Sequence, residues 1–163
     1  MSIVLFRVDE RLIHGQVIVG WGTELHPSRI VVVDDEIAAS QWEQELYAMG
    51  LPSEVTPAFE AVDGAREHLA SWRNGGERVV VLTRDIATMR RLADGGVMRG
   101  DEVNIGGIHY APGRSAILPY VYLSDTEINH LEAIAEQGVR VTARDLPGAR
   151  KVDLKELLQH RHN

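Results

Sequence analysis

The stretch Phe6-Arg-Val-Asp-Glu-Arg-Leu-Ile-His-Gly-Gln-Val17 places four charges and one histidine between two apolar segments. Before it, residues 3–8 form a short apolar, β-branched run, which predicts a buried first strand. After it, apolar residues return at helical spacing from Gly15 to Leu25, which predicts a helix. The polar residues from Asp9 to His14 therefore lie at the carboxyl end of the first strand, the edge where open α/β sheets bind ligands.

His14 is the candidate catalytic residue of this stretch. Its imidazole is neutral for an appreciable fraction of the time near pH 7, so it can attack an electrophile such as phosphorus without an added base. Asp9 or Glu10 could hold the second ring nitrogen and fix the tautomer of the ring. A histidine at a strand-to-helix turn can equally be a capping or packing residue, and the residues alone leave both interpretations open.

The phosphoryl-binding candidates are Arg11, Gly15, Asp9 and Arg7. A guanidinium offers a planar fork that matches phosphate oxygens. Unpaired backbone N–H groups around Gly15, where the helix starts, would add donors to the same anion. We expect a shallow loop that faces solvent rather than a closed pocket, because too tight a grip on a phosphoryl group would trap it on the histidine.

Helices alternate with strands along the rest of the chain. Buried strands are predicted at residues 29–34, 78–83, 102–109 and, last in the chain, 139–143. Proline weakens two further runs, and residues 54–59 are expected near a sheet edge. Residues 115–123 are expected to contain a strand that Pro119 either interrupts or places at an edge, and that pairs antiparallel with the preceding strand. This pattern predicts an α/β fold with one open, mainly parallel sheet, helices on both faces and one antiparallel strand at the edge.

The carboxyl ends of the parallel strands gather further candidates for loop contacts. These are Asp34, Thr83, Asn104, Gly106 and Gly107. For Asp34 a helix cap is the favoured role, because aspartate is a preferred N-cap. A metal-dependent aspartyl-phosphate site is the sharper alternative, but an acceptor aspartate and a phosphate-pairing lysine do not stand at comparable strand ends.

Three segments resemble one protein family. The segment Arg7-Val-Asp-Glu-Arg-Leu-Ile-His-Gly-Gln-Val17 closely resembles the opening motif of the EIIB component of the mannose/fructose/sorbose family of the bacterial phosphoenolpyruvate-dependent sugar phosphotransferase system. The segment Ser28-Arg-Ile-Val-Val-Val-Asp-Asp-Glu-Ile-Ala-Ala39 is similar to its second strand and following helix, and Val103-Asn-Ile-Gly-Gly-Ile108 to its Asn-Val-Gly-Gly segment. In order and spacing the similarity covers most of the chain.

The resemblance implies a phosphohistidine carrier formed by a single domain over residues 1–163, with a short frayed tail from about residue 159. His14 would take a phosphoryl group from the histidine of an EIIA partner and pass it to a sugar held by membrane EIIC and EIID subunits. In that family the phosphorylated atom is Nδ1, and the arginine at the position of Arg11 helps hold the phosphoryl group. No metal and no cofactor is implied.

Composition narrows the class of function. A net charge of −7 and a pI near 5.5 argue against nucleic acid as a partner, since binding phosphate backbones needs a basic face. The chain has no cysteine, which excludes disulfides and the thiolate acceptor that other EIIB families use. Neither a secretory signal nor a membrane-length apolar run is present, so we expect a cytoplasmic protein that reaches the membrane only through partner subunits.

Two alternatives to a transport role stay open. A stand-alone EIIB-like protein could signal through its phosphorylation state, and a small-anion binding module could use His14 and Arg11 only to hold a ligand. The oligomeric state is equally open, with a homo-oligomer as one outcome. The glycine pairs do not form a dinucleotide-binding fingerprint, because no Gly-x-Gly-x-x-Gly follows the first strand.

Overall fold

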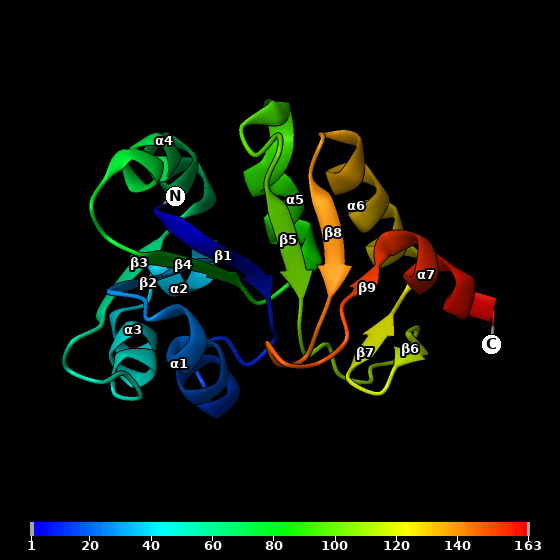
Figure 1. Cartoon of the computed structure of the whole chain (residues 1–163), viewed down its shortest axis with the longest axis horizontal. Coiled ribbons are helices and arrows are strands. Elements are labelled where there is room, and N and C mark those ends of the chain that lie inside the picture. The colour runs from blue at the N-terminus through cyan, green and yellow to red at the C-terminus, as the bar shows by residue number, and fades with distance from the viewer. Residues whose placement is uncertain (1, 163) are drawn as a thin grey trace.

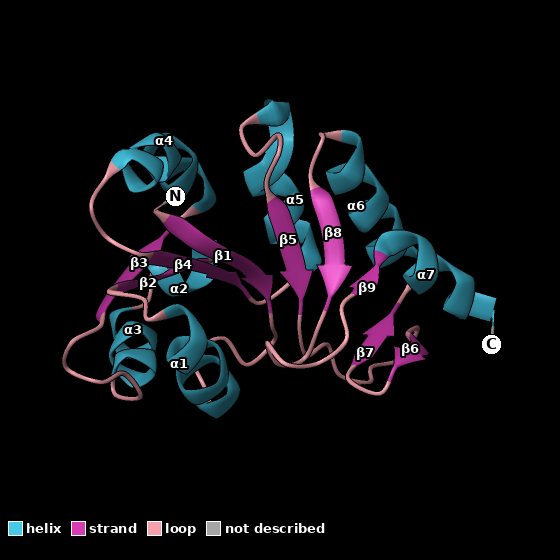
Figure 2. Cartoon of the chain, viewed as in Figure 1, coloured by secondary structure: helices cyan, strands magenta, loops and turns pink. Residues whose placement is uncertain are grey.

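A seven-stranded sheet forms the centre of the molecule, whose residues 2–162 are described by a computed structural model (Figures 1 and 2). Its strands are β1 (Ile3–Val8), β2 (Arg29–Val33), β3 (Thr56–Glu60), β4 (Val79–Thr83), β5 (Glu102–Ile105), β8 (Arg140–Ala143) and β9 (Val152–Asp153). They lie in the order β3-β2-β4-β1-β5-β8-β9, and the neighbours from β3 to β8 are parallel while β8 and β9 are antiparallel. The predicted fold class is confirmed.

Helices cover both faces of this sheet (Figure 1). They are η1 (Gln16–Trp21), α1 (Gly22–Leu25), α2 (Asp35–Ala38), α3 (Gln41–Ala48), α4 (Val62–Asn74), α5 (Ile86–Ala93), η2 (Asp94–Gly96), α6 (Asp125–Glu136), α7 (Leu154–Gln159) and η3 (His160–His162). The alternation of side chains along a strand explains the two layers. On β2, Val31 and Val33 pack in the cluster that contains α4, α5 and α6, whereas Ile30 and Val32 pack with η1 and α3.

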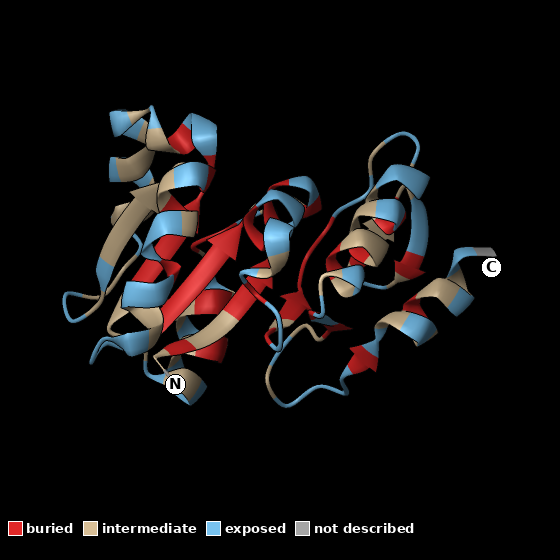
Figure 3. Ribbon diagram, turned by 90° about the horizontal axis from the view of Figure 1, so that it is seen from above, coloured by how far each residue is buried: buried red, intermediate tan, exposed pale blue. Residues whose placement is uncertain are grey.

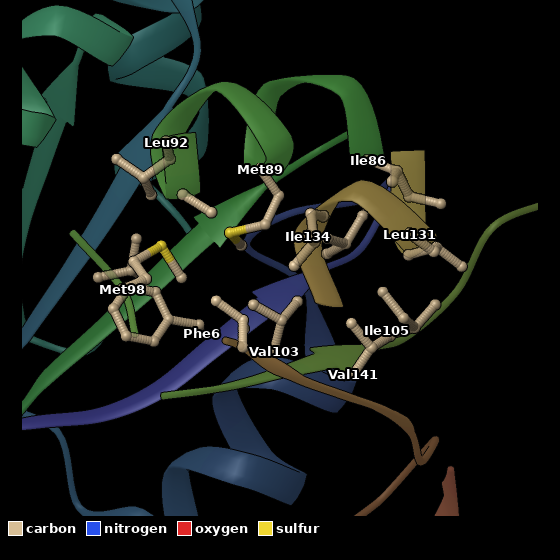
Figure 4. Packing of buried hydrophobic residues seen from close by; sticks show 14 of the residues in the cluster. Phe6, Ile86, Met89, Leu92, Met98, Val103, Ile105, Leu131, Ile134 and Val141 are labelled. Carbon is tan, nitrogen blue, oxygen red and sulfur yellow. The ribbon is translucent and has the colours of Figure 1, made fainter. Parts of the chain in front are cut away.

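The larger cluster lies between β1, β5 and β8 and the helices α5 and α6. Figure 4 shows Met89 and Leu92 of α5 and Ile134 of α6 among the side chains of these strands. All three of these helix residues are fully buried. In Figure 3 the central strands and the inner sides of the helices are buried, while the outer sides are exposed. Burial of this continuous apolar layer stabilises the sheet and so holds the carboxyl ends of its strands in place.

The run of residues 115–123 is interrupted at Pro119, one of the two outcomes that its sequence predicts. It is a hairpin of β6 (Ser115–Leu118) and β7 (Val121–Leu123), which turns at Pro119 and Tyr120 and forms a separate two-stranded sheet. Proline cannot donate a ladder hydrogen bond, so the run breaks there. The predicted antiparallel pairing with the preceding strand is wrong, because β5 pairs with β1 and β8 and runs parallel to both.

The antiparallel strand at the sheet edge is β9, which follows the strand that was predicted to be the last. Its two residues are too few for a hydrophobic pattern to reveal. The frayed tail expected from about residue 159 is instead helical through residue 162, as η3 follows α7; Asn163 lies outside the described residues. Between residues 2 and 162, no helix has both the length and the apolar character needed to cross a membrane.

Candidate functional site

The loop of residues 9–15 joins β1 to η1 at the carboxyl edge of the sheet, and Asp9 ties it together. The Asp9 carbonyl oxygen accepts from Leu12 N at 3.0 Å, and its Oδ1 accepts from Arg11 N at 3.0 Å. Leu12 adopts a left-handed backbone with a φ of 54°, which is costly for a residue with a Cβ, while its side chain is fully buried in the core. Core packing therefore holds the loop in a conformation that its sequence would not adopt alone.

His14 is more enclosed than the sequence predicted. Its side chain is only 13% exposed, and its Nδ1 lies 2.9 Å from the Leu12 carbonyl oxygen. Because a carbonyl oxygen can only accept, Nδ1 carries the hydrogen in this orientation and its lone pair is not available for attack. The other nitrogen, Nε2, is covered, makes no hydrogen bond and lies 3.8 Å from Asp9 Oδ2. The ring must turn before either nitrogen can meet a phosphorus atom.

Asp9 and Arg7 form a fully buried ion pair beneath the loop. Arg7 Nη2 donates to Asp9 Oδ2 at 3.0 Å, and both side chains are 0% exposed. Burial lowers the pKa of the Arg7 guanidinium, while the neighbouring Asp9 carboxylate raises it. Arg7 was expected to bind the phosphoryl group, but its guanidinium points into the protein. Its role in this structure is to hold Asp9.

The remaining donors of Arg7 are directed at other parts of the chain. Nη1 donates to Asn104 Oδ1 and to the carbonyl oxygen of Arg144 at 2.9 Å, and Nη2 donates to the carbonyl oxygen of Asp145 at 3.2 Å. The guanidinium carbon lies 5.2 Å from the centre of the Trp21 ring, a cation–π distance. Arg7 therefore joins β1 to β5, to the loop after β8 and to η1.

The glycine pair after β5 serves this buried cluster. A Cβ on Gly106 would lie 2.7 Å from Arg7 Nε and closer still to Arg7 Cζ, so only glycine leaves room for the guanidinium. Gly107 N donates to Asp9 Oδ2 at 3.3 Å, and its carbonyl oxygen accepts from Glu10 N at 2.9 Å. The structure thus brings Asn104, Gly106 and Gly107 to the His14 loop, as the sequence predicted, but beneath it.

Arg11 and Gly15 form the open side of the loop. The Arg11 side chain is exposed, and its Nη2 makes one long hydrogen bond of 3.4 Å to Gln16 Oε1. Gly15 is exposed too, and a Cβ built on it would have no atom within 4 Å. The space next to His14 is therefore free on the Gly15 side. The exposed guanidinium of Arg11 belongs to the same loop.

Asp34 and Thr83 have partners of their own at the same edge. Asp34 caps α2 by accepting from Ile37 N at 3.0 Å, which confirms the favoured role, and it pairs with Arg84 at 2.7 Å. The Thr83 hydroxyl donates to the Asp85 carbonyl oxygen at 2.9 Å. Thr83 does support the loop, but through its carbonyl oxygen, which accepts from Asp9 N at 2.9 Å.

Sequence reasoning missed Trp21, Arg144 and Asp145 as parts of this site. Trp21 fitted a helix core position, and its Nε1 also donates to the Asp145 carbonyl oxygen at 3.1 Å. Residues 144 and 145 contribute their main-chain carbonyl oxygens, and no residue type in a sequence indicates such a contact. One signal was available for the buried pair: Arg7 and Asp9 are two residues apart where β1 ends, and residues at this spacing share a face as long as the backbone stays extended. Within residues 2–162, no group of three or more histidine or acidic side chains could hold a metal ion.

Comparisons with known proteins agree with this fold. Residues 3–163 match the family model described as PTS system sorbose subfamily IIB component. The N-acetylgalactosamine-specific phosphotransferase enzyme IIB component 1 of Escherichia coli (strain K12) is 30% identical over 165 residues, covering 95% of this chain and 98% of that protein. The mannose-specific EIIAB component of the same strain is 31% identical over 158 residues, covering 97% of this chain but 49% of that protein.

A solved structure gives the same result. The crystal structure of manxB from Thermoanaerobacter tengcongensis has a TM-score of 0.84 and 33% sequence identity, covering 96% of this chain and 95% of that chain. Fold and similarity together define a class, the phosphocarrier components of sugar phosphotransferase systems. Within that class, the chain belongs to the sorbose subfamily of IIB components, which confirms the resemblance drawn from its three motifs.

Proposed function

We propose that this chain is a single phosphocarrier domain that accepts a phosphoryl group on His14 from the histidine of an EIIA protein. It then passes the group to a sugar bound by membrane EIIC and EIID subunits. The observation that carries the proposal is the loop itself: a histidine at the carboxyl edge of the sheet, anchored from below by a buried ion pair and flanked by an exposed arginine.

The transfer begins with a turn of the His14 ring. Breaking the hydrogen bond between Nδ1 and the Leu12 carbonyl oxygen lets the ring swing into the open space over Gly15. Once the ring faces solvent, the Nδ1 proton passes to water and Nε2 takes a proton from water, so the ring stays neutral and Nδ1 gains a free lone pair. This lone pair forms the new N–P bond while the N–P bond to the donor histidine breaks. In the second transfer a sugar hydroxyl oxygen attacks the phosphorus, the bond to His14 breaks, and the hydroxyl proton leaves to a base of the partner.

The neighbouring residues position and hold the group. The exposed guanidinium of Arg11 donates hydrogen bonds to the phosphoryl oxygens, and the backbone around Gly15 supplies further N–H donors. Asp9 lies beside Nε2 and orients the ring, and Arg7 positions Asp9. We assign Asn104, Gly106 and Gly107 to the support of this buried pair rather than to contact with phosphate.

The comparisons support an EIIA donor. The mannose-specific relative joins an EIIA and an EIIB part in one protein, as its name EIIAB states, and this chain matches about half of it. A separate EIIA protein would use the same exposed loop side, where Arg11 and Gly15 lie.

Incubation with phosphorylated EIIA, followed by phosphorus NMR, tests the proposal. We expect one acid-labile phosphohistidine signal that disappears in His14→Gln. His130→Gln is the matched control, since His130 pairs with Arg90 on the helix layer away from the loop. Unchanged labelling in His14→Gln, or no labelling of the wild-type chain, contradicts the proposal.

The enclosure of His14 favours one second candidate, a small-anion binding module in which the ring never becomes a nucleophile. In the observed orientation both nitrogens face protein atoms. A binder would give saturable binding of inorganic phosphate that weakens in Arg11→Ala, with no covalent label on His14. The same NMR experiment therefore separates the two functions.

A further inference from the structure

A second histidine, His109, is fixed beside the loop that carries His14. Its backbone N–H donates to Glu10 Oε1, and its ring Nδ1 lies 3.3 Å from the same oxygen. Arg114 holds the residue from the other side, because its Nη1 donates to the His109 carbonyl oxygen at 2.8 Å and to Glu10 Oε2 at 3.2 Å. The His109 side chain is nevertheless 58% exposed. The ring is therefore both oriented and accessible.

The other nitrogen of His109 faces the space over Gly107. A Cβ built on Gly107 would lie 3.8 Å from His109 Nε2 and 3.6 Å from Asp9 Oδ1. Asp9 in turn lies 3.8 Å from His14 Nε2. One glycine thus separates His109 Nε2 from the carboxylate beside His14, and no side chain at position 107 fills that space.

A phosphoryl group on His14 would add negative charge to a loop whose two carboxylates are already paired with Arg7 and Arg114. Asp9 and Glu10 place two carboxylates in the same loop, and the phosphoryl group adds about two further negative charges near neutral pH. Like charges at short range are unfavourable unless cations offset them. The loop therefore needs a positive group that can contact the phosphoryl oxygens.

Two of the nearby arginines are already engaged. Arg7 is buried against a carboxylate, and Arg114 is shared between Glu10 and Glu127, at 3.2 Å and 2.8 Å. Arg11 is exposed within the loop, and His109 is exposed beside it. His109 is thus the group that can supply a second, pH-dependent cation at this surface.

We propose that His109 is a second phosphoryl-binding residue, whose protonated ring donates from Nε2 to a phosphoryl oxygen carried by His14. The inference rests on the proposed function, because the contact exists only when His14 is phosphorylated. Glu10 orients the ring through Nδ1, whose distance to Glu10 Oε1 is 3.3 Å. The contact is present below the titration midpoint of His109 and is lost as the pH rises through it.

The direct test follows the titration of His109 by NMR of its ring protons in the full chain, before and after loading with phosphoramidate. This small donor phosphorylates imidazole nitrogens without a protein partner. We expect the His109 midpoint to rise by about 0.5–1 pH unit on phosphorylation, because the phosphoryl group favours the imidazolium. His68 is the matched reference, since it is 50% exposed and pairs with Glu60 at 3.0 Å, but on α4 at the far end of the sheet.

Variants give an independent test. In His109→Gln we expect the rate of His14 phosphorylation to fall by about three- to tenfold near pH 6 and to match the wild type near pH 8.5, which is well above the ordinary pKa of an imidazole, about 6.5. His109→Arg should restore the rate at both pH values, because its cation does not titrate. His68→Gln should leave the rate unchanged at both.

The outcomes separate this inference from the function on which it rests. If His14 is labelled but the His109 midpoint moves no more than that of His68, or if His109→Gln loses the same factor at both pH values, His109 does not bind the phosphoryl group. If His14 is labelled by neither phosphorylated EIIA nor phosphoramidate, the proposed function fails and this inference fails with it.

Discussion

Replacing Asp9 by asparagine tests whether the buried ion pair holds the His14 loop. Asp9 accepts from Arg7 Nη2 at 3.0 Å, Gly107 N at 3.3 Å and Arg11 N at 3.0 Å. An asparagine can keep one acceptor, but its amide nitrogen would face the donors of Arg7 and Gly107. Arg7 is 0% exposed and cannot lose its proton, so the variant leaves an unpaired charge in the core.

Breaking a fully buried pair in this way costs about 3–5 kcal/mol. With a urea m-value of about 2 kcal/mol per molar, the midpoint of unfolding should fall by about 1.5–2.5 M. Tryptophan fluorescence measures this change directly, because Trp21 is buried beside Arg7. Glu10→Gln is the control, since Glu10 is 30% exposed and its ion pair should contribute about 1 kcal/mol or less.

A loss below about 1 kcal/mol in Asp9→Asn would refute the reasoning, because it would mean that Arg7 reaches solvent or finds other partners. A double variant adds a second check. Combining Asp9→Asn with Arg7→Met removes the orphaned charge, so it should be more stable than Asp9→Asn alone. If the double variant is less stable by the sum of both single losses, the two side chains do not act as a pair.

Two further predictions concern the glycine pair and the dependence of stability on pH. Gly106→Ala should unfold the chain at much lower urea than Gly107→Ala, because a Cβ at 106 meets the buried guanidinium whereas one at 107 meets its neighbours at ordinary contact distances of 3.6–3.8 Å; equal midpoints for the two variants would contradict this. The backbone N–H of Val62 and then the Arg91 guanidinium lower the pKa of Asp35, so its contribution is present above its unfolded pKa of about 3.9 and is lost as the pH falls through its folded pKa. In Asp35→Asn the free energy of unfolding should therefore fall less steeply with decreasing pH below about pH 4 than in the wild type. Urea titrations at several pH values measure this dependence, and the same slope in both proteins would contradict the prediction.

The sheet could be predicted because its strands are both apolar and continuous. β2 and β4 are runs of valine, isoleucine and leucine that are buried on both faces, so a single pattern identified each. Predicting the hairpin of β6 and β7 required the position of its turn at Pro119 to be known. The strand β9 forms because it pairs with β8, not because of its own residues. Such elements are defined by their neighbours in space, which a sequence does not list.

Which residues gather around His14 could be predicted from the sequence, but how far their side chains are buried could not. The Arg7–Asp9 spacing favours the same side for both side chains at the end of β1, yet nothing local says that this side is the buried one. The enclosure of His14 comes from the left-handed turn at Leu12, which sequence patterns do not predict for leucine. Carbonyl oxygens of residues 144 and 145 complete the cluster, and every residue type has one.

These two carbonyls are separated from Arg7 by 137 and 138 positions along the chain. During synthesis β1 is made before the other strands of this sheet, and its arginine cannot be buried in this way until β8 and the loop after it have also emerged from the ribosome. A truncated product that ends before this point carries the histidine but not the shape that presents it.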